Sequence, residues 1–298
     1  MKIAAIQSKK NFWYDTNSRN DYPLSKCIAL RDEFMEKEFL LIEQALKEGN
    51  DLVVTIEAFN ASINLDDNRY DFSEVCEPLD GELMARFCDL SKKYGAYIVA
   101  GLYTTKDKKA YNSACLFSPD GRLAQVHNKV HLPAGEELSI THGDSYRIFK
   151  TPFGNIGMLV CWDLQFPEAA RELALMGADI ICCPTWGCED IYVRCRAYEN
   201  SITLAIAMGV CSDSEIWEGC DPSCIIDNMG NISAIGTREG SQIVSCELDI
   251  KKEPAPQYGS ERYTKHSSMR RTRLTQRRPD SYKQITEKIP PLYKRYTI

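Results

Sequence analysis

Short apolar runs alternate with amphipathic segments along most of the chain, and this alternation constrains the fold more than any other feature of the sequence. Ile3 to Ile6 and Leu52 to Ile56 are compact apolar runs, and the second is mostly β-branched, as expected of a strand covered on both faces. Between them, apolar residues recur at helical spacing from Phe34 to Leu46. The unit then repeats, with a helix predicted over 83–94 and a strand over 97–103. Such alternation predicts an α/β fold.

The rest of the chain continues this pattern and adds hairpins. Ser118-Pro119-Asp120-Gly121 separates two strand-like runs and predicts an antiparallel turn. The later elements that we expect are strands over 156–160, 179–183, 202–210 and 242–248, and helices over 167–176 and 190–200. This order indicates one α/β domain over residues 1–250, with a mixed sheet or two stacked sheets and helices outside. Residues 251–298 read as a polar, proline-bearing C-terminal extension, which we expect to pack on the domain or on a partner subunit.

The charge balance and the hydropathy pattern exclude several classes of protein. With 36 Lys+Arg against 42 Asp+Glu, the formal net charge is −6, so we expect no nucleic-acid partner. Seven basic residues lie between Arg262 and Arg278, a run that we interpret as a solvated or subunit-contacting tail. No segment approaches about 18 uninterrupted apolar residues, and the N-terminal apolar run is too short for the core of a signal peptide. The sequence therefore predicts a cytoplasmic protein without a membrane partner.

The cysteines do not indicate a metal site. The chain has 13 cysteines and four histidines, but the cysteines are scattered and no C-x-x-C pair occurs. A structural zinc ion needs four ligands, usually from two close pairs, which this spacing does not supply. We interpret most of these thiols as small buried side chains in a reducing compartment. We expect no metal and no other cofactor.

Three polar residues stand directly after predicted strands. Glu57 and Cys161 each follow an apolar strand, and Lys129 follows the strand over 122–127. In open α/β sheets, ligands gather at the carboxyl ends of the strands. Cys161 lies where a strand turns into the helix that begins at Pro167, a geometry that exposes a nucleophile and turns the following N–H groups toward an oxyanion. By composition alone, however, Cys161 is better explained as one more buried thiol.

The segments around these residues resemble a known family. They are Thr55-Ile56-Glu57-Ala58-Phe59, His127-Asn128-Lys129-Val130-His131-Leu132, and Cys161-Trp162-Asp163 continued by Pro167-Glu168-Ala169-Ala170-Arg171. In type, order and spacing they resemble the Glu, Lys and Cys blocks of the nitrilase superfamily of carbon–nitrogen hydrolases, and Tyr111-Asn112-Ser113 is a supporting match. The resemblance covers residues 1–248. It implies a triad of Glu57, Lys129 and Cys161 on a four-layer α-β-β-α sandwich, and a chain that forms homodimers or larger homo-oligomers.

The chemistry of such a triad is coherent in its own right. A free thiol is only a few per cent thiolate at neutral pH, so Cys161 needs a base beside it, and Glu57 can accept its proton. When the sulfur attacks a carbonyl or nitrile carbon, Lys129 and the N–H of Trp162 can stabilise the negative charge that builds up. An acyl-thioester forms, and Glu57 can then protonate the leaving nitrogen and activate the water that cleaves the thioester.

Further site residues follow from the resemblance. A second carboxylate is expected in the loop after the Lys block, where Glu136 is favoured and Glu137 is the close rival. His131 either supports the site or forms a Cys–His pair with Cys161, an arrangement that would leave Glu57 without a role. Trp186 falls where the family has a wall of the substrate pocket, although ordinary core packing explains it equally well.

We therefore predict an enzyme that hydrolyses non-peptide carbon–nitrogen bonds of a small-molecule substrate. Cys161-Trp162-Asp163 resembles the amidase and N-carbamoyl-hydrolase branches, and the basic tail resembles the C-terminal segment of carbamoyl-amide hydrolases. An N-carbamoyl amine or amino acid, or a small amide, is the expected substrate, with ammonia as a product. The alternatives are an ω-amidase, aliphatic amidase or nitrilase, a catalytically silent binding subunit, and a redox sensor that uses its thiols.

Overall fold

We describe the chain from a computed structural model, which places residues 1–9, 22–63, 65, 70–210, 221–255 and 268–288. The chain divides into two compact units, Met1–Lys252 and Glu253–Ile298. Within the parts that the structure describes, no helix combines the length and the apolar character needed to cross a membrane.

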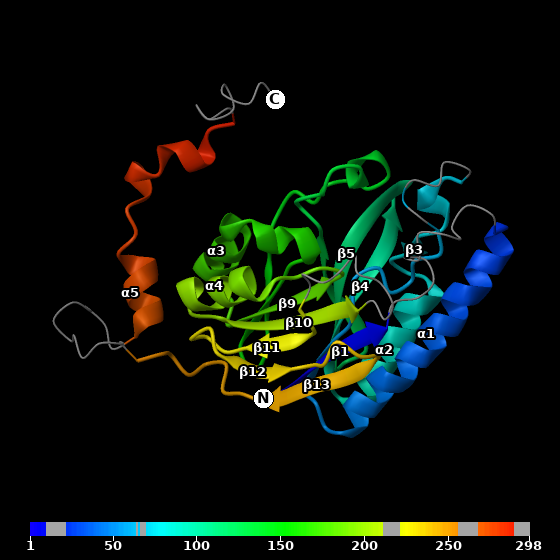
Figure 1. The fold of residues 1–298 in the computed structure, drawn as a ribbon, viewed down its shortest axis with the longest axis horizontal. Coiled ribbons are helices and arrows are strands. Elements are labelled where there is room, and N and C mark those ends of the chain that lie inside the picture. The colour runs from blue at the N-terminus through cyan, green and yellow to red at the C-terminus, as the bar shows by residue number, and fades with distance from the viewer. Residues whose placement is uncertain (10–21, 64, 66–69, 211–220, 256–267, 289–298) are drawn as a thin grey trace. The chain divides into compact units, whose positions relative to one another are not determined.

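The first unit contains two sheets (Figure 1). In spatial order, the first sheet consists of β13 (Gln242–Glu247), β1 (Lys2–Lys9), β2 (Leu52–Val54), β4 (Tyr97–Lys106), β5 (Lys109–Ser118) and β6 (Arg122–Asn128), with the short β3 (Glu77–Pro78) beside β4. Its inner strands β1, β2 and β4 run parallel, whereas β13, β5 and β6 are antiparallel to their neighbours. The carboxyl ends of β2 and β6 therefore lie at the same edge of this sheet, because β6 follows the antiparallel β5 and regains the direction of β4.

The second sheet continues from the first at one corner. In spatial order it consists of β12 (Ile232–Ile235), β11 (Cys224–Ile226), β10 (Thr203–Val210), β9 (Ile180–Thr185), β8 (Asn155–Met158) and β7 (Ile148–Lys150). The strands β8, β9 and β10 are parallel. A short parallel pairing joins the sheets, with Ser8 opposite Gly209 and Lys9 opposite Val210.

Two pairs of helices cover the outer faces of these sheets. The helices α1 (Leu24–Lys47) and α2 (Glu82–Tyr94) pack on the first sheet, and α3 (Pro167–Met176) and α4 (Asp190–Asn200) lie over the second. Along β1 the side chains alternate, because Ala4 and Ile6 face the helices whereas Ile3 and Ala5 face the other sheet. The structure thus confirms the predicted four-layer α-β-β-α sandwich.

The predicted elements are found, but two strands end earlier than their apolar runs. β2 ends at Val54 and β8 at Met158, each two residues before the end of the predicted strand. The backbone still follows a neighbouring strand on one side, since Thr55 N–H donates to Val99 C=O at 2.9 Å and Leu159 N–H to Cys182 C=O at 3.1 Å. These one-sided extensions lead into Glu57 and Cys161.

The second unit contains the short helix α5 (Met269–Thr275) and two turns of 3₁₀ helix, Pro279–Ser281 and Lys283–Thr286. Ser268 caps α5, with its hydroxyl accepting the N–H of Arg271 at 3.2 Å. In the basic run predicted here, Arg271 pairs with Glu253 at 3.1 Å, and residues 262–267 lie outside the described chain.

Candidate active site

The three residues that the sequence places after strands come together at one end of the sandwich. Glu57 follows β2, Lys129 follows β6, and Cys161 follows β8. Glu57 and Lys129 are both buried, with exposed fractions of 4% and 2%, and Cys161 is partly exposed. The electrostatic surroundings of the Cys161 thiol include both Glu57 and Lys129. The site is therefore assembled from three segments that are far apart in the sequence.

The backbone at Cys161 adopts a conformation that few non-glycine residues take. Its φ is 43°, in the left-handed region, and it begins a 3₁₀ turn, Cys161–Gln165, that leads into α3. Pro167 opens α3, where its missing N–H has no helical partner to lose. A left-handed non-glycine residue costs about 1–3 kcal/mol and persists where the surrounding structure imposes it, often at functional sites. This is the sharp strand-to-helix turn that the sequence predicts for a nucleophile.

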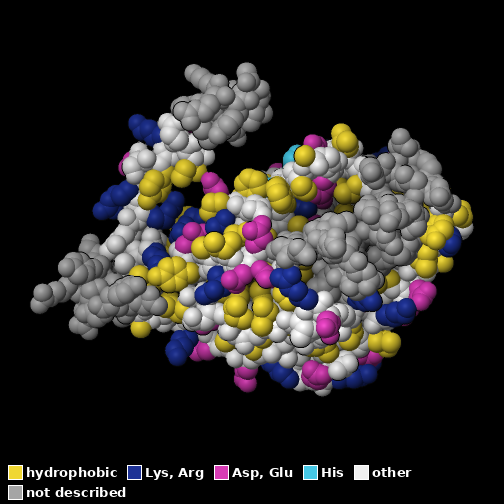
Figure 2. Space-filling view, viewed as in Figure 1, with side chains coloured by type: hydrophobic (Ala, Val, Ile, Leu, Met, Phe, Trp, Pro, Cys, Tyr) yellow, Lys and Arg dark blue, Asp and Glu magenta, His cyan; other side chains and the backbone are white. Residues whose placement is uncertain are grey.

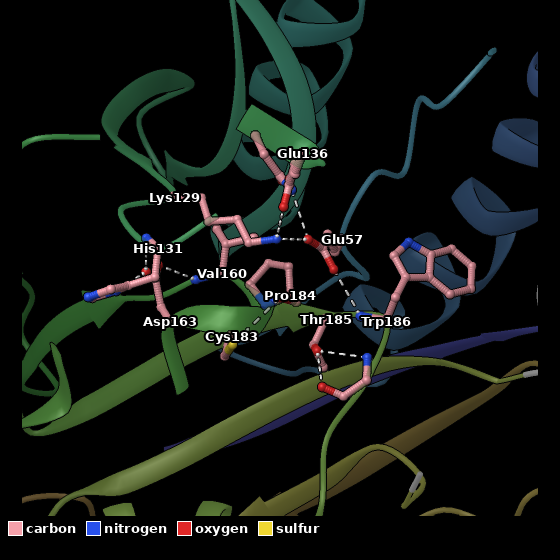
Figure 3. Close-up of polar contacts among 12 residues, drawn as sticks. Glu57, Lys129, His131, Glu136, Val160, Asp163, Cys183, Pro184, Thr185 and Trp186 are labelled. Carbon is pink, nitrogen blue, oxygen red and sulfur yellow. Dashed lines mark hydrogen bonds and ion pairs between the residues drawn. The ribbon is translucent and has the colours of Figure 1, made fainter. Parts of the chain in front are cut away.

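Lys129 lies between two carboxylates (Figure 3). Its Nζ donates to Glu57 Oε1 at 3.0 Å and to Glu136 Oε2 at 2.7 Å. Asn112 bridges the same two carboxylates, since its Nδ2 donates to Glu57 Oε1, the oxygen that Lys129 also contacts, and to Glu136 Oε1, both at 2.8 Å. The four side chains thus form a closed ring of hydrogen bonds, which we call the carboxylate ring.

Glu57 is also fixed from the second sheet. Its Oε2 accepts the backbone N–H of Trp186 at 3.0 Å, and the same Trp186 N–H interacts with the Cys161 thiol. The Thr185 hydroxyl also contacts this thiol. Since the Trp186 N–H acts on both groups, Oε2 of Glu57 lies on the side of the sulfur whose proton this carboxylate is expected to take.

Gly101 makes room for Glu57. A Cβ at position 101 would lie 2.4 Å from the carbonyl oxygen of Ile56 and 2.7 Å from the Cα of Glu57. Any side chain there would displace the backbone that carries the carboxylate. The close passage of β4 past this backbone thus depends on glycine.

Charge and burial set the protonation states in the site. Burial would lower the pKa of Lys129, but the charges of Glu57, Cys161 and Glu136 outweigh it and raise that pKa above its ordinary value. Burial, and then the charge of Glu57, raise the pKa of Cys161 to about 12, although Lys129, Thr185 and the Trp186 N–H act in the opposite direction. At rest Cys161 is therefore a neutral thiol beside the ammonium group of Lys129, and to act as a nucleophile it would need a base.

The structure distinguishes the two candidate carboxylates of the loop after β6. Glu136 is 6% exposed and belongs to the carboxylate ring, whereas Glu137 is exposed to solvent. Burial, and beyond it the charge of Glu57, raise the pKa of Glu136, while Lys129 and Asn112 lower it. Of the pair, only Glu136 contacts Lys129 in the structure, as the sequence analysis favours.

Asp163 links the lysine segment to the cysteine turn. Its Oδ1 accepts the backbone N–H of Val130 at 3.2 Å and of His131 at 2.9 Å, and its Oδ2 accepts the N–H of Val160 at 3.2 Å. Its carboxylate also contacts His131 Nδ1 at 2.9 Å and His127 Nε2 at 3.1 Å. Burial opposes the charge of Asp163, but these hydrogen bonds outweigh it and lower its pKa. The fully buried Asp163 thus holds together the turns that present Lys129 and Cys161.

In the structure, His131 contacts Asp163 and Phe166. Besides its bond to Asp163, its ring stacks on Phe166 with centroids 3.8 Å apart and planes inclined by 10°. His131 thus helps to position the loop after Lys129, and its substrate or oxyanion contact, like the alternative pair with Cys161, stays a prediction.

The two tryptophans of the prediction have different surroundings. Trp186 is 7% exposed, and its ring lies against Gly209 of β10 so closely that a Cβ there would be 2.0 Å from a ring carbon. Trp162, by contrast, is 40% exposed and follows the nucleophile directly in the turn. Trp186 thus contributes packing and a backbone donor, whereas its place in the wall of a substrate pocket and an oxyanion contact of the Trp162 N–H stay predictions.

Asn112 and Asp163 are the site residues to which the sequence analysis gives no role. Each lies in a quoted motif, Tyr111-Asn112-Ser113 and Cys161-Trp162-Asp163, and this is the only signal for them in the sequence. Across the described stretches, no group of three or more His, Cys, Asp or Glu residues is arranged to hold a metal ion.

Comparisons with known proteins agree with this geometry. The family model for carbon–nitrogen hydrolases matches residues 27–253. A nitrilase of Pyrococcus abyssi is 36% identical over 224 residues, which is 74% of this chain and 84% of the relative. Omega-amidase NIT2 of Xenopus tropicalis is 27% identical over 239 residues, 74% of this chain and 85% of the relative.

A solved structure extends the similarity over nearly the whole chain. The carbon–nitrogen hydrolase of Helicobacter pylori superimposes with a TM-score of 0.74 at 25% identity, over 97% of this chain and 98% of that one. On the family match, the relatives and the fold together, the chain belongs to the carbon–nitrogen hydrolases of the nitrilase superfamily and is a hydrolytic enzyme.

Proposed function

We propose that this enzyme hydrolyses the terminal carboxamide of a small molecule through an acyl-thioester on Cys161, and that it releases ammonia. The observation that carries this proposal is the carboxylate ring of Glu57, Asn112, Lys129 and Glu136 beside a strained cysteine turn. It supplies a base, a fixed cation and a nucleophile within one small volume, and carboxamide hydrolysis needs these three groups.

In the first half of the reaction, the neutral thiol of Cys161 attacks the carboxamide carbon while Glu57 takes its proton. The substrate oxygen becomes negative, and Lys129, together with the N–H of Trp162, stabilises it. The tetrahedral intermediate collapses as Glu57 returns the proton to the nitrogen. The carbon–nitrogen bond breaks, ammonia leaves, and an acyl-thioester remains on the sulfur.

In the second half, a water molecule takes the place of the thiol. Glu57, again ionised, accepts a proton from this water as the water oxygen attacks the thioester carbon. The carbon–sulfur bond then breaks, the sulfur regains its proton, and the acid product leaves. Throughout both halves Glu136 holds Lys129 in place, since its Oε2 is 2.7 Å from Nζ.

Two substrate classes carry a terminal carboxamide and fit this chemistry. The first is an N-carbamoyl amine or amino acid, supported by the resemblance of Cys161-Trp162-Asp163 and of the basic tail to carbamoyl hydrolases. Its ureido carbon would be attacked, and the products would be ammonia, carbon dioxide and the free amine. The second is an ω-amide, supported by the name of the relative omega-amidase NIT2.

Product analysis separates these classes. We expect ammonia release from at least one member of a panel of N-carbamoyl amino acids, ω-amides, aliphatic amides and nitriles, and carbon dioxide release singles out the carbamoyl class. Cys161→Ala should abolish turnover and leave folding unchanged, because it removes the nucleophile. Cys195→Ala is the matched control, since Cys195 is exposed on α4. Turnover that survives Cys161→Ala, or no turnover of any panel member by the unsubstituted enzyme, would refute the proposal.

A further inference from the structure

We propose that Asn112 is a positioning residue of this site, which aligns Glu57 and Glu136 on Lys129 and thereby sets the pH range in which Glu57 works as the base. The inference rests on the proposed role of Cys161 and Glu57. It assigns to β5, which carries none of the expected triad, a part in the reaction.

The contacts of Asn112 reach every charged member of the carboxylate ring. Its side-chain amide donates one hydrogen bond to each of Glu57 and Glu136, at 2.8 Å in both cases. Its backbone carbonyl accepts the N–H of Lys129 at 2.8 Å. One residue thus orients both carboxylates by its side chain and the ammonium-bearing residue by its backbone. Asn112 is itself 1% exposed, so solvent does not compete for these bonds.

The charges around Asn112 explain why an amide suits this position. The groups that face it are the carboxylates of Glu57 and Glu136 and, across the ring, the ammonium of Lys129, with the Cys161 thiol beyond. Two carboxylates share one cation, so a second pair of donors is needed to balance their repulsion. An amide nitrogen supplies two N–H groups without adding a charge. A hydrogen bond to an ionised carboxylate favours the ionised form, and loss of the donor favours protonation.

The register of the first sheet fixes the position of this amide. Asn112 lies opposite Tyr103 in the β4–β5 ladder, and its neighbour Ser113 lies opposite Asn128 in the β5–β6 ladder. Ser113 Oγ also donates to Asn128 Oδ1 at 2.9 Å. Because strand side chains alternate, Asn112 faces the site while Tyr111 and Ser113 face away from it. The ladder therefore locks Asn112 against the segment that presents Lys129.

Alkylation of Cys161 by iodoacetamide tests this role without a substrate. The rate, followed by mass mapping across pH, reports transfer of the thiol proton to Glu57. With Asn112→Ala or the isosteric Asn112→Asp, we expect the rate at pH 7 to fall about 10- to 100-fold, as for loss of a hydrogen bond to a charged group. We also expect the acid side of the pH profile to move up, by about one unit with Asn112→Ala because the base has lost a donor, and by more with Asn112→Asp because the new carboxylate also adds a like charge.

Two reference variants make the result specific. Asn50→Ala removes a buried asparagine whose Nδ2 donates to the Ala45 carbonyl at 2.8 Å, remote from the site at the amino end of β2. It should lower the melting temperature without moving the pH profile. A profile for Asn112→Asp or Asn112→Ala that superimposes on the wild type, or an equal displacement by Asn50→Ala, would overturn the assignment.

Glu57→Gln separates failure of this inference from failure of the proposed function. If Glu57 is the base, Glu57→Gln slows labelling and flattens the acid side of the profile. Wild-type labelling by Glu57→Gln would refute the role of Glu57, and with it the proposed function. Slow labelling by Glu57→Gln together with wild-type labelling by both Asn112 variants would refute the role of Asn112 alone.

Discussion

At the scale of single residues, the site depends on which of two adjacent carboxylates touches Lys129. Glu136 is buried in the carboxylate ring and Glu137 is exposed, although the two are neighbours with the same side chain. Sequence reasoning leaves this choice open, because a one-residue change of register in a loop reverses which side chain points inward. The 3₁₀ turn Glu136–Leu138, which follows Gly135 in the left-handed region at φ 94°, decides it.

Glu136→Gln should lower kcat about 10- to 100-fold with little change in KM, because it keeps the shape of the side chain but removes the charge that holds Lys129. Steady-state kinetics on the substrate found by ammonia release measure this. Glu137→Gln is the matched control and should retain wild-type kinetics. Equal losses in the two variants would contradict the assignment of Glu136.

At the scale of elements, a buried carboxyl outside the site, that of Glu38, connects a helix to the ends of two strands. Glu38 of α1 is 2% exposed and is hydrogen-bonded to Ser8 at the end of β1 and, at 3.4 Å, to Ser241 beside β13. Burial raises the pKa of Glu38 to about 7, although both serines lower it. In the unfolded chain the same carboxyl ionises near pH 4.3. Between these values the unfolded state binds fewer protons than the folded state, so this group makes stability fall as pH rises.

Glu38→Gln should therefore stabilise the enzyme at pH 8, by an amount on the order of 3 kcal/mol, because glutamine stays neutral and can still contact Ser8. The gain should shrink toward zero as the pH falls below about 4, where the wild-type carboxyl becomes protonated in both states. Urea unfolding of the wild type and the variant at several pH values measures the difference. A gain that does not depend on pH would show that Glu38 is not the group responsible.

The elements themselves are largely predictable from the sequence, and their side-chain contacts are not. Apolar periodicity places α3 over the same residues as the structure, with Pro167 and Gly177 marking its ends. It cannot place Asn112 between Glu57 and Glu136, because that contact depends on the register of β5 against β4 and β6. The contacts of Asp163 are equally beyond sequence patterns, because its partner His131 is more than 30 residues away in the sequence.

At the scale of the whole molecule, self-association stays a proposal that the sequence resemblance suggests. The neighbouring helices α3 and α4 of the first unit both expose large apolar side chains. On α3 these are Leu175 and Met176, and on α4 they are Ile191 and Tyr198. On the face drawn in Figure 2, hydrophobic side chains are interspersed with acidic and basic ones. We propose that a second copy of this chain covers the helices α3 and α4.

Light scattering coupled to gel filtration should give the mass of a dimer or a multiple of it. Ile191→Glu should lower that mass toward the 33.8 kDa of one chain, because Ile191 is 71% exposed and a charge there would be buried in the interface. Leu138→Glu is a control on an apolar residue that is 84% exposed and lies outside these helices. A monomeric wild type, or the same mass for both variants, would exclude an interface at α3 and α4.

The close packing of the Trp186 ring on Gly209 limits which substitutions this enzyme can accept. Position 209 carries no chemical group, yet the indole of Trp186 occupies the volume that a side chain would need there, and the backbone of Trp186 holds Glu57. Substitution of Gly209 by alanine would therefore push Trp186 aside and displace the carboxylate of Glu57, which follows β2 of the other sheet. Among descendants of this sequence, Gly209 should change about as rarely as Glu57, and only together with a smaller residue at position 186.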